Sequence, residues 1–115
     1  MRAEQSPEVF DHTLALSSVG GDGEFLSELV GLIHAALPAV LADIREGLAV
    51  GDLRAVGKNA RLARAAAEYV SARETYKSAL QLESMVGMED FQGVQRATAS
   101  LEQEVKRLQL VLSEL

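Results

Sequence analysis

The chain has 115 residues, a formal net charge of −6 and no cysteine. This length fits a single domain, and the lack of cysteine excludes a disulfide framework, a thiol nucleophile and a cysteine-based metal centre. The acidic balance argues against general binding of nucleic acid, and a composition rich in alanine and leucine but poor in aromatic residues favours packed helices over sheets.

The N-terminal sequence MRAEQSPEVF lacks the apolar stretch of a secretory signal. We expect residues 1–8 to form a flexible N-terminus and residues 9–115 to form one helical domain. No apolar run in the chain approaches the ~20 residues that span a membrane. We therefore expect a cytoplasmic protein without membrane insertion.

Two helices are predicted in the first part of the chain. Asp11 is placed to cap a short helix that ends at Gly20-Gly21, and Asp22 is placed to cap a long one. Pro38 lies inside the long helix and should bend it, but the apolar phase continues past it until Gly51. The apolar positions that define this helix are Phe25, Leu26, Leu29, Ile33, Ala36, Leu37, Val40, Leu41, Ile44 and Leu48.

Three further helices are predicted after this point. Asp52 caps the third helix, which ends near a break at Ser71. Its narrow, alanine-rich seam consists of Leu53, Val56, Ala60, Ala63, Ala67 and Val70. The fourth covers about 73–86 and ends at Gly87, and Asp90 caps the last. The apolar residues of the fourth helix that fall roughly on one side are Tyr76, Ala79, Leu80, Leu82 and Met85. The last helix has the most regular seam, which consists of Phe91, Val94, Thr98, Leu101, Val105, Leu108, Leu112 and Leu115.

Four long amphipathic helices joined by short turns predict an all-α fold. We expect an antiparallel up-and-down four-helix bundle, with the short additional N-terminal helix covering one end. No stretch alternates in the manner of a strand.

Motifs for catalysis and cofactor binding are absent from the sequence. It contains no glycine-rich phosphate loop and no HExxH motif. His34 has no carboxylate three or four residues away, so a bundle-type metal site lacks local support, and His12 is expected to be solvated. We therefore predict no enzyme activity, no cofactor and no metal.

The third helix carries a row of cations in an acidic protein. Arg54, Lys58 and Arg61 fall at i, i+4 and i+7 on one helical face, Arg64 follows three residues later, and the next residue, Ala65, is small. One interpretation is an ordinary solvated face. The other is a docking face for an acidic partner, because complementary charge speeds association and sets orientation.

In order and spacing, several segments resemble the histidine-containing phosphotransfer (HPt) domains of two-component signalling. They are VFD near the start, GGDGEFLSELV, the long segment LIHAALPAVLADIREGLAVGDL, and QLESM late in the fourth helix. The resemblance covers nearly the whole chain. It implies a helical bundle, with receiver domains of response regulators or histidine kinases as partners.

This chain departs from the motif that defines the family. The family pattern Ala-His-x-Leu-Lys-Gly falls on the segment Ala60-Arg61-Leu62-Ala63-Arg64-Ala65. Arg61 stands in place of the phosphoacceptor histidine, and its protonated guanidinium has no lone pair for attack on phosphorus. Arg64 replaces the lysine and keeps a cation, whereas Ala65 adds a methyl group in place of the glycine.

Three hypotheses follow for the function. The leading one is a phosphorylation-incompetent HPt-like domain that binds a receiver domain or a histidine kinase through Arg54, Lys58, Arg61, Arg64 and Ala65. The second is a structural or oligomerisation bundle within a larger signalling protein, with self-association as a homodimer through the regular last helix. The third is an active phosphotransfer protein that uses a non-standard residue.

Overall fold

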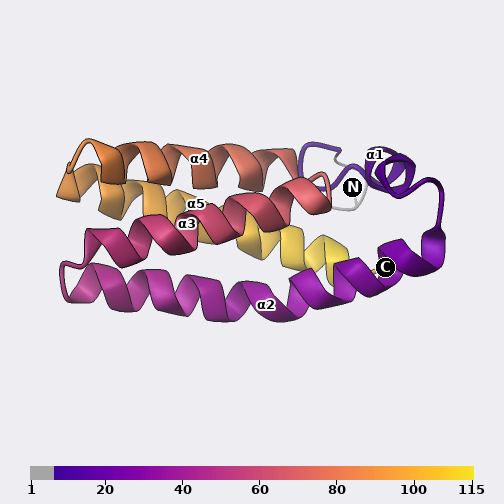
Figure 1. The fold of residues 1–115 in the computed structure, drawn as a ribbon, viewed down its shortest axis with the longest axis horizontal. Helices are drawn as coiled ribbons and strands as arrows, with labels where there is room; N and C mark the ends of the chain where they lie inside the picture. The colour runs from indigo at the N-terminus through magenta and orange to yellow at the C-terminus, as the bar shows by residue number, and fades with distance from the viewer. Residues whose placement is uncertain (1–6) are drawn as a thin grey trace.

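The computed structural model describes residues 7–115, which form helices and no strand (Figure 1). The prediction of an all-α fold is confirmed. The longest helix has 27 residues, which at ~1.5 Å per residue accounts for most of the 42 Å length of the molecule. The helices are α1 (His12–Ser18), α2 (Gly23–Ala49), α3 (Leu53–Tyr69), α4 (Arg73–Gly87) and α5 (Phe91–Ser113).

Aspartate caps fix the starts of most helices. In each case the side chain accepts a hydrogen bond from the backbone N–H three residues later, which satisfies a donor that the helix leaves free. The capped helices are α1, α2, α3 and α5, and the caps are Asp11, Asp22, Asp52 and Asp90. The exception is α4, which follows Ala72 and has no side-chain cap. Instead, the N–H of Glu74 donates to the carbonyl of Glu8 at 2.9 Å and ties the N-terminal segment to this helix.

Residues in the left-handed backbone region follow the first four helices, beginning with Gly20 after α1 at φ 67°. Gly51 follows α2 with φ 72°, as predicted, and Ser71 marks the turn after α3 with φ 55°. The predicted end of α4 is early, because Gly87 is its last helical residue and Glu89 has the left-handed φ of 55°. A non-glycine residue therefore occupies the turn position for which the sequence offered a nearby glycine.

The four long helices pack as an antiparallel ring, so the predicted up-and-down bundle is confirmed. The order of packing is α2 against α3, α3 against α4, α4 against α5, and α5 back against α2. The α2–α5 interface is the smallest of the four. The short α1 lies at one end of the bundle beside α2 (Figure 1), as expected for the additional helix.

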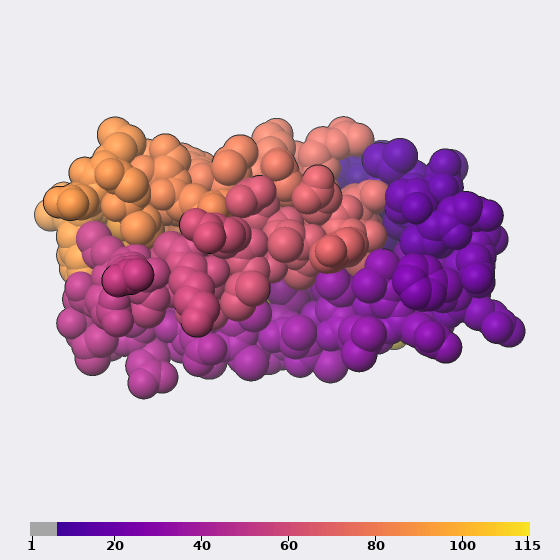
Figure 2. Space-filling view, viewed as in Figure 1, coloured from indigo at the N-terminus to yellow at the C-terminus, as the bar shows by residue number. Residues whose placement is uncertain are grey.

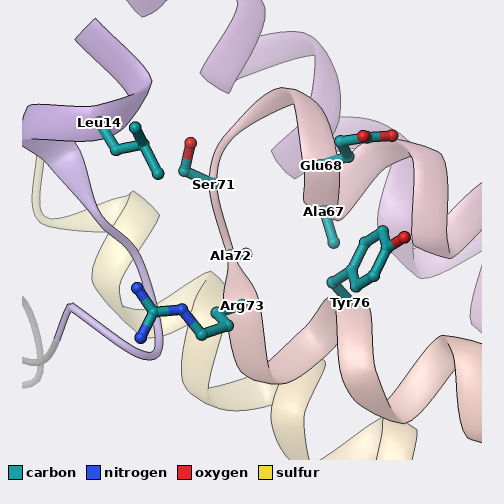
Figure 3. A pocket seen from close by; sticks show the side chains of 7 residues that line it. All are labelled: Leu14, Ala67, Glu68, Ser71, Ala72, Arg73 and Tyr76. Atoms are coloured by element: carbon teal, nitrogen blue, oxygen red, sulfur yellow. The ribbon is translucent and has the colours of Figure 1, made fainter. Parts of the chain in front are cut away.

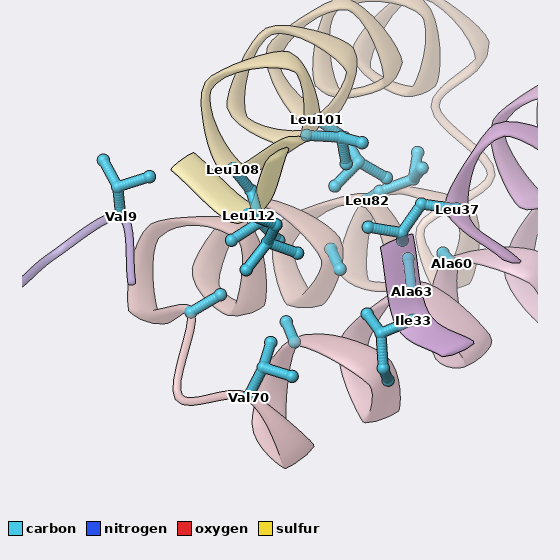
Figure 4. Close-up of a cluster of buried hydrophobic side chains, with 14 of the residues drawn as sticks. Val9, Ile33, Leu37, Ala60, Ala63, Val70, Leu82, Leu101, Leu108 and Leu112 are labelled. Atoms are coloured by element: carbon cyan, nitrogen blue, oxygen red, sulfur yellow. The ribbon is translucent and has the colours of Figure 1, made fainter. Parts of the chain in front are cut away.

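A single cluster of apolar side chains fills the centre of the bundle (Figure 4). Small residues on α3 let that helix lie close to its neighbours, and the predicted alanines Ala60, Ala63 and Ala67 are all buried. The regular seam of α5 is also consumed inside the bundle. Its buried members are Val94, Thr98, Leu101, Val105, Leu108 and Leu112. The seam that motivated the self-association hypothesis is therefore used within one chain.

Some apolar residues that the periodicity assigned to a seam are exposed instead. They lie at helix ends or on outer faces, where no neighbouring helix covers them. They are Phe25, Leu80, Phe91 and Leu115. Residues 1–6 of the predicted flexible N-terminus lie outside the described part of the chain, while Phe10 is almost fully buried.

One helix is more apolar than the sequence analysis anticipated. By length and composition alone, α2 could cross a membrane, with a mean hydropathy of 1.8 over an 18-residue window. This corrects the expectation that no apolar run approaches a membrane span. The observation is weak, because a core helix of a soluble protein passes the same test. Leu26, Val30, Ile33 and Leu37 of α2 point into the bundle core.

Candidate functional site

The predicted cations lie on the outer face of α3, between α2 and α4. Arg54, Lys58 and Arg61 are exposed, and the side chain of Arg61 is 73% accessible to solvent. The apolar seam of the same helix points inward, so amphipathic packing turns this row toward solvent. Figure 2 shows α3 and α4 side by side on one face of the molecule.

A hollow of about 480 Å³ lies between α3 and α4 beside these cations. Arg54, Lys58 and Arg61 line it from α3, and α4 contributes Glu83 among others. Gly57 lets the two helices approach at its base, because an added Cβ would lie 3.1 Å from a methyl carbon of Val86. The structure therefore brings three of the predicted site residues around one cavity.

The fourth predicted cation has a partner inside the domain. Both Nε and a terminal nitrogen of Arg64 donate to the carboxylate of Glu83, the latter at 3.3 Å. These hydrogen bonds raise the pKa of Arg64 above its usual value, with a smaller contribution from Tyr76. Arg61 lies farther from the same carboxylate, with Nε 3.8 Å from Oε1. Arg64 is thus held against α4, whereas Arg61 is extended into solvent.

The register of the α3–α4 hairpin explains why Glu83 meets these arginines. The turn near Ser71 places Gly57 opposite Val86, so Ala60 is level with Glu83. Side chains on a helix incline toward its N-terminus, which lets Arg64 reach back by one turn to that level. Sequence analysis missed this pair, although counting outward from the turn at Ser71 would have brought the two charges together.

Ala65 borders a different cavity, toward α2. Its neighbours there include Phe25 and Leu29 of α2 and Tyr69 of α3, around a hollow of about 430 Å³. Leu62, the residue after Arg61, is half exposed. The row of cations on α3 is therefore flanked on its α2 side by apolar surface that the sequence analysis did not assign to the site.

Another hollow, of about 260 Å³, lies at the opposite end of α3 (Figure 3). Leu14 of α1, the turn at Ser71 and Ala72, and Tyr76 of α4 surround it. It carries one cation, Arg73, and one carboxylate, so its charges do not favour an acidic partner. None of the predicted site residues lines it.

Neither histidine is placed for phosphoryl chemistry beside the cations. His12 is exposed on α1, where its ring meets Phe10 edge-on at 5.8 Å. His34 is half-buried on α2, and the side chain of Gln109 donates to its backbone carbonyl at 3.3 Å. Within residues 7–115, no group of three or more metal-ligating side chains is gathered in one place.

Comparison with known proteins identifies the fold. No protein-family model and no curated protein matches the sequence. A crystal structure of the HPT domain from the Hpt sensor hybrid histidine kinase of Shewanella superposes with a TM-score of 0.85, covering 95% of this chain and 94% of that one. Sequence identity to it is 14%. The chain therefore has the fold of an HPt domain, which confirms the fold implied by the resemblance.

Proposed function

We propose that this protein is an HPt-like signalling domain that binds a two-component partner and does not relay phosphate. The observation that carries the proposal is the exposed guanidinium of Arg61 on the outer face of α3, in a chain with the HPt fold. The partner is a receiver domain of a response regulator or part of a histidine kinase. A cytoplasmic location and the absence of enzyme activity belong to the same proposal.

The chemistry of position 61 supports a binding role over a relay role. Phosphoryl relay needs a nitrogen with a free lone pair at neutral pH, which imidazole supplies and guanidinium does not. The neighbouring Arg64 is likewise protonated and is engaged with Glu83. His12 and His34 lie on other helices, which argues against the hypothesis of a non-standard phosphoacceptor.

The surface around Arg61 supports docking to an acidic protein. Arg54 and Lys58 extend the positive charge along α3, and Leu62 with Tyr69 adds exposed apolar area beside it. Protein interfaces commonly combine an apolar, aromatic centre with charges that steer the partner. The receiver active site, as the resemblance implies, is an acidic cluster of complementary sign.

Two measurements on the same sample test the proposal. Receiver domains from the source cell are titrated with the chain at low and high salt, and the chain is incubated with a histidine kinase, a receiver and labelled ATP. We expect binding that weakens with salt, because the Debye length falls from ~10 Å at 0.1 M ionic strength to ~3 Å at 1 M. We also expect no label on the chain. Acid-labile label on it, or no binding to any receiver or kinase, would refute the proposal.

A further inference from the structure

The hollow between α3 and α4 has the positive charge of an anion site and is large enough to admit an anion. Among the described residues, three cations line it, and the one carboxylate there is that of Glu83. Its volume of about 480 Å³ falls in the range of ~300–1,000 Å³ that small-molecule sites occupy. The concentration of positive charge is notable because the whole chain carries −6.

Two of these cations have no counter-ion in the part of the chain that the structure describes. Within residues 7–115, neither Arg54 nor Lys58 forms an ion pair, although other basic side chains, such as Arg45 with Glu102, do so. Like charges held near each other repel, so an anion placed between them is stabilised by both. The third cation, Arg61, contacts Glu83 only loosely at 3.8 Å.

Glu83 is itself an anion held by arginines of α3 at the edge of the hollow. Its carboxylate accepts hydrogen bonds from Arg64 and lies near Arg61, while its side chain is only 19% exposed. It therefore neutralises Arg64 and part of Arg61 but leaves Arg54 and Lys58 uncompensated. A ligand with more negative charge and more acceptor oxygens than a carboxylate would suit these uncompensated cations.

We propose that this hollow binds a phosphoryl group, a tetrahedral dianion, through Arg54, Lys58 and Arg61. A phosphoryl group carries about −1.5 to −2 charges and three strong acceptor oxygens, which suits three cationic side chains, and arginine forks bind it in a bidentate manner. The group is bound and not transferred. This inference rests on the proposed function in one respect: the phosphoryl group comes from the phosphorylated aspartate of the partner receiver. The domain thus prefers the phosphorylated partner.

Titration with inorganic phosphate tests the site without any partner. Backbone amide and arginine side-chain NMR signals of the full chain are followed at constant ionic strength, with chloride as the matched salt. We expect saturable shifts near Gly57, Arg61 and Gly87, with an affinity on the order of 1 mM. Shifts that never saturate, or that spread equally to Arg96 and Lys106 on α5, would overturn the inference.

Charge variants of the hollow make the test specific. Arg54→Gln with Lys58→Gln should weaken phosphate binding by about tenfold, the factor expected for at least one lost charge-assisted hydrogen bond. The matched pair Arg96→Gln with Lys106→Gln removes the same charge from exposed positions on α5 and should leave binding unchanged. Equal effects of the two pairs would overturn the inference, because they would mean that only net charge matters.

Glu83→Gln should change phosphate binding in the opposite direction, by strengthening it. Without the internal carboxylate, Arg61 and Arg64 become available, so phosphate should bind several-fold more tightly. Unchanged or weaker binding, in a variant whose circular dichroism shows a folded domain, would count against the proposal. If this variant does not fold, the double variant Arg54→Gln and Lys58→Gln decides the question by itself.

A receiver domain prepared with and without a stable phosphoryl mimic separates this inference from the proposed function. Tighter binding of the mimic-loaded receiver, lost in the Arg54→Gln and Lys58→Gln double variant, supports both. Equal binding of the two receiver forms, together with no saturable phosphate binding, overturns the inference and leaves the docking function intact. Saturable phosphate binding without binding of any receiver or kinase supports the anion site and contradicts the proposed function.

Discussion

The guanidinium of Arg64 on α3 is hydrogen-bonded to the carboxylate of Glu83 on α4 through two of its nitrogens. This contact joins two neighbouring helices of the bundle at a partly buried position. The adjacent arginine of the motif, Arg61, is mostly exposed and makes only a long contact with the same carboxylate. The two arginines thus have different roles: Arg64 links helices, whereas Arg61 faces solvent, where we propose that it meets a partner.

Arg64→Gln should lower the melting temperature of the domain by a few degrees, because Glu83 would lose its two hydrogen bonds while remaining largely covered. Arg61→Gln is the matched control, with the same chemical change one turn away on an exposed side chain, and should leave the melting temperature nearly unchanged. Thermal unfolding followed by circular dichroism measures both. Equal losses would mean that Arg64 has no special structural role.

Thr98→Val should stabilise the fold by about 1 kcal/mol, because a buried hydroxyl without a partner is costly. The hydroxyl of Thr98 is fully buried on α5 and has no hydrogen-bond partner among the described residues. Thr75→Val is the control, since the equally buried hydroxyl of Thr75 reaches the carbonyl of Glu104 at 3.4 Å. Urea unfolding should show a gain for the first variant only. A loss for Thr98→Val would indicate an ordered water at that site.

Leu108→Ala should lower the free energy of unfolding by about 2–5 kcal/mol, since Leu108 is completely buried in the bundle. Leu110→Ala, two residues away on the outer face of α5, should cost less than about 0.5 kcal/mol. Because the seam is filled within one chain, the unfolding midpoint should not depend on protein concentration. Concentration-dependent unfolding, or a dimer by light scattering, would restore the oligomerisation hypothesis.

Arg61→His combined with Ala65→Gly should enable the domain to accept a phosphoryl group, because the double change places an exposed imidazole at the motif position and removes the extra methyl group. Label transfer from a phosphorylated receiver measures this, and the product should be acid-labile. Leu62→His is the matched control, with a half-exposed imidazole one residue later. Label on the Leu62→His variant alone would show that the motif register is wrong.

Most of the fold could be predicted from the sequence because its signals are local. Aspartate caps, the glycine after α2 and the 3–4 spacing of apolar residues act within a few residues of chain, so they are readable one helix at a time. The end of α4 was misplaced because Glu89 adopts a left-handed conformation that residue type alone does not favour. Phe25 and Leu80 were misassigned because periodicity does not show which faces a neighbouring helix covers.

The site was predicted less completely because it depends on contacts between helices. The row of Arg54, Lys58 and Arg61 follows from helical spacing alone. The hollow beside this row could not be predicted in the same way, because its shape depends on how closely Gly57 lets α4 approach α3. The neutralisation of Arg64 by Glu83 likewise arises from the register of two helices, which single-helix patterns do not contain.

Charge reversal on α3 tests most directly whether its cations bind a two-component partner. The affinity of a receiver domain for the Lys58→Glu and Arg61→Glu double variant is compared with that for Arg96→Glu and Lys106→Glu, which reverses the same charge on the exposed face of α5. The account predicts a loss of about 100-fold or more for the α3 variant, as expected when attractive contacts become repulsive at an interface, and little change for the α5 variant. Equal affinities of the two variants would contradict it.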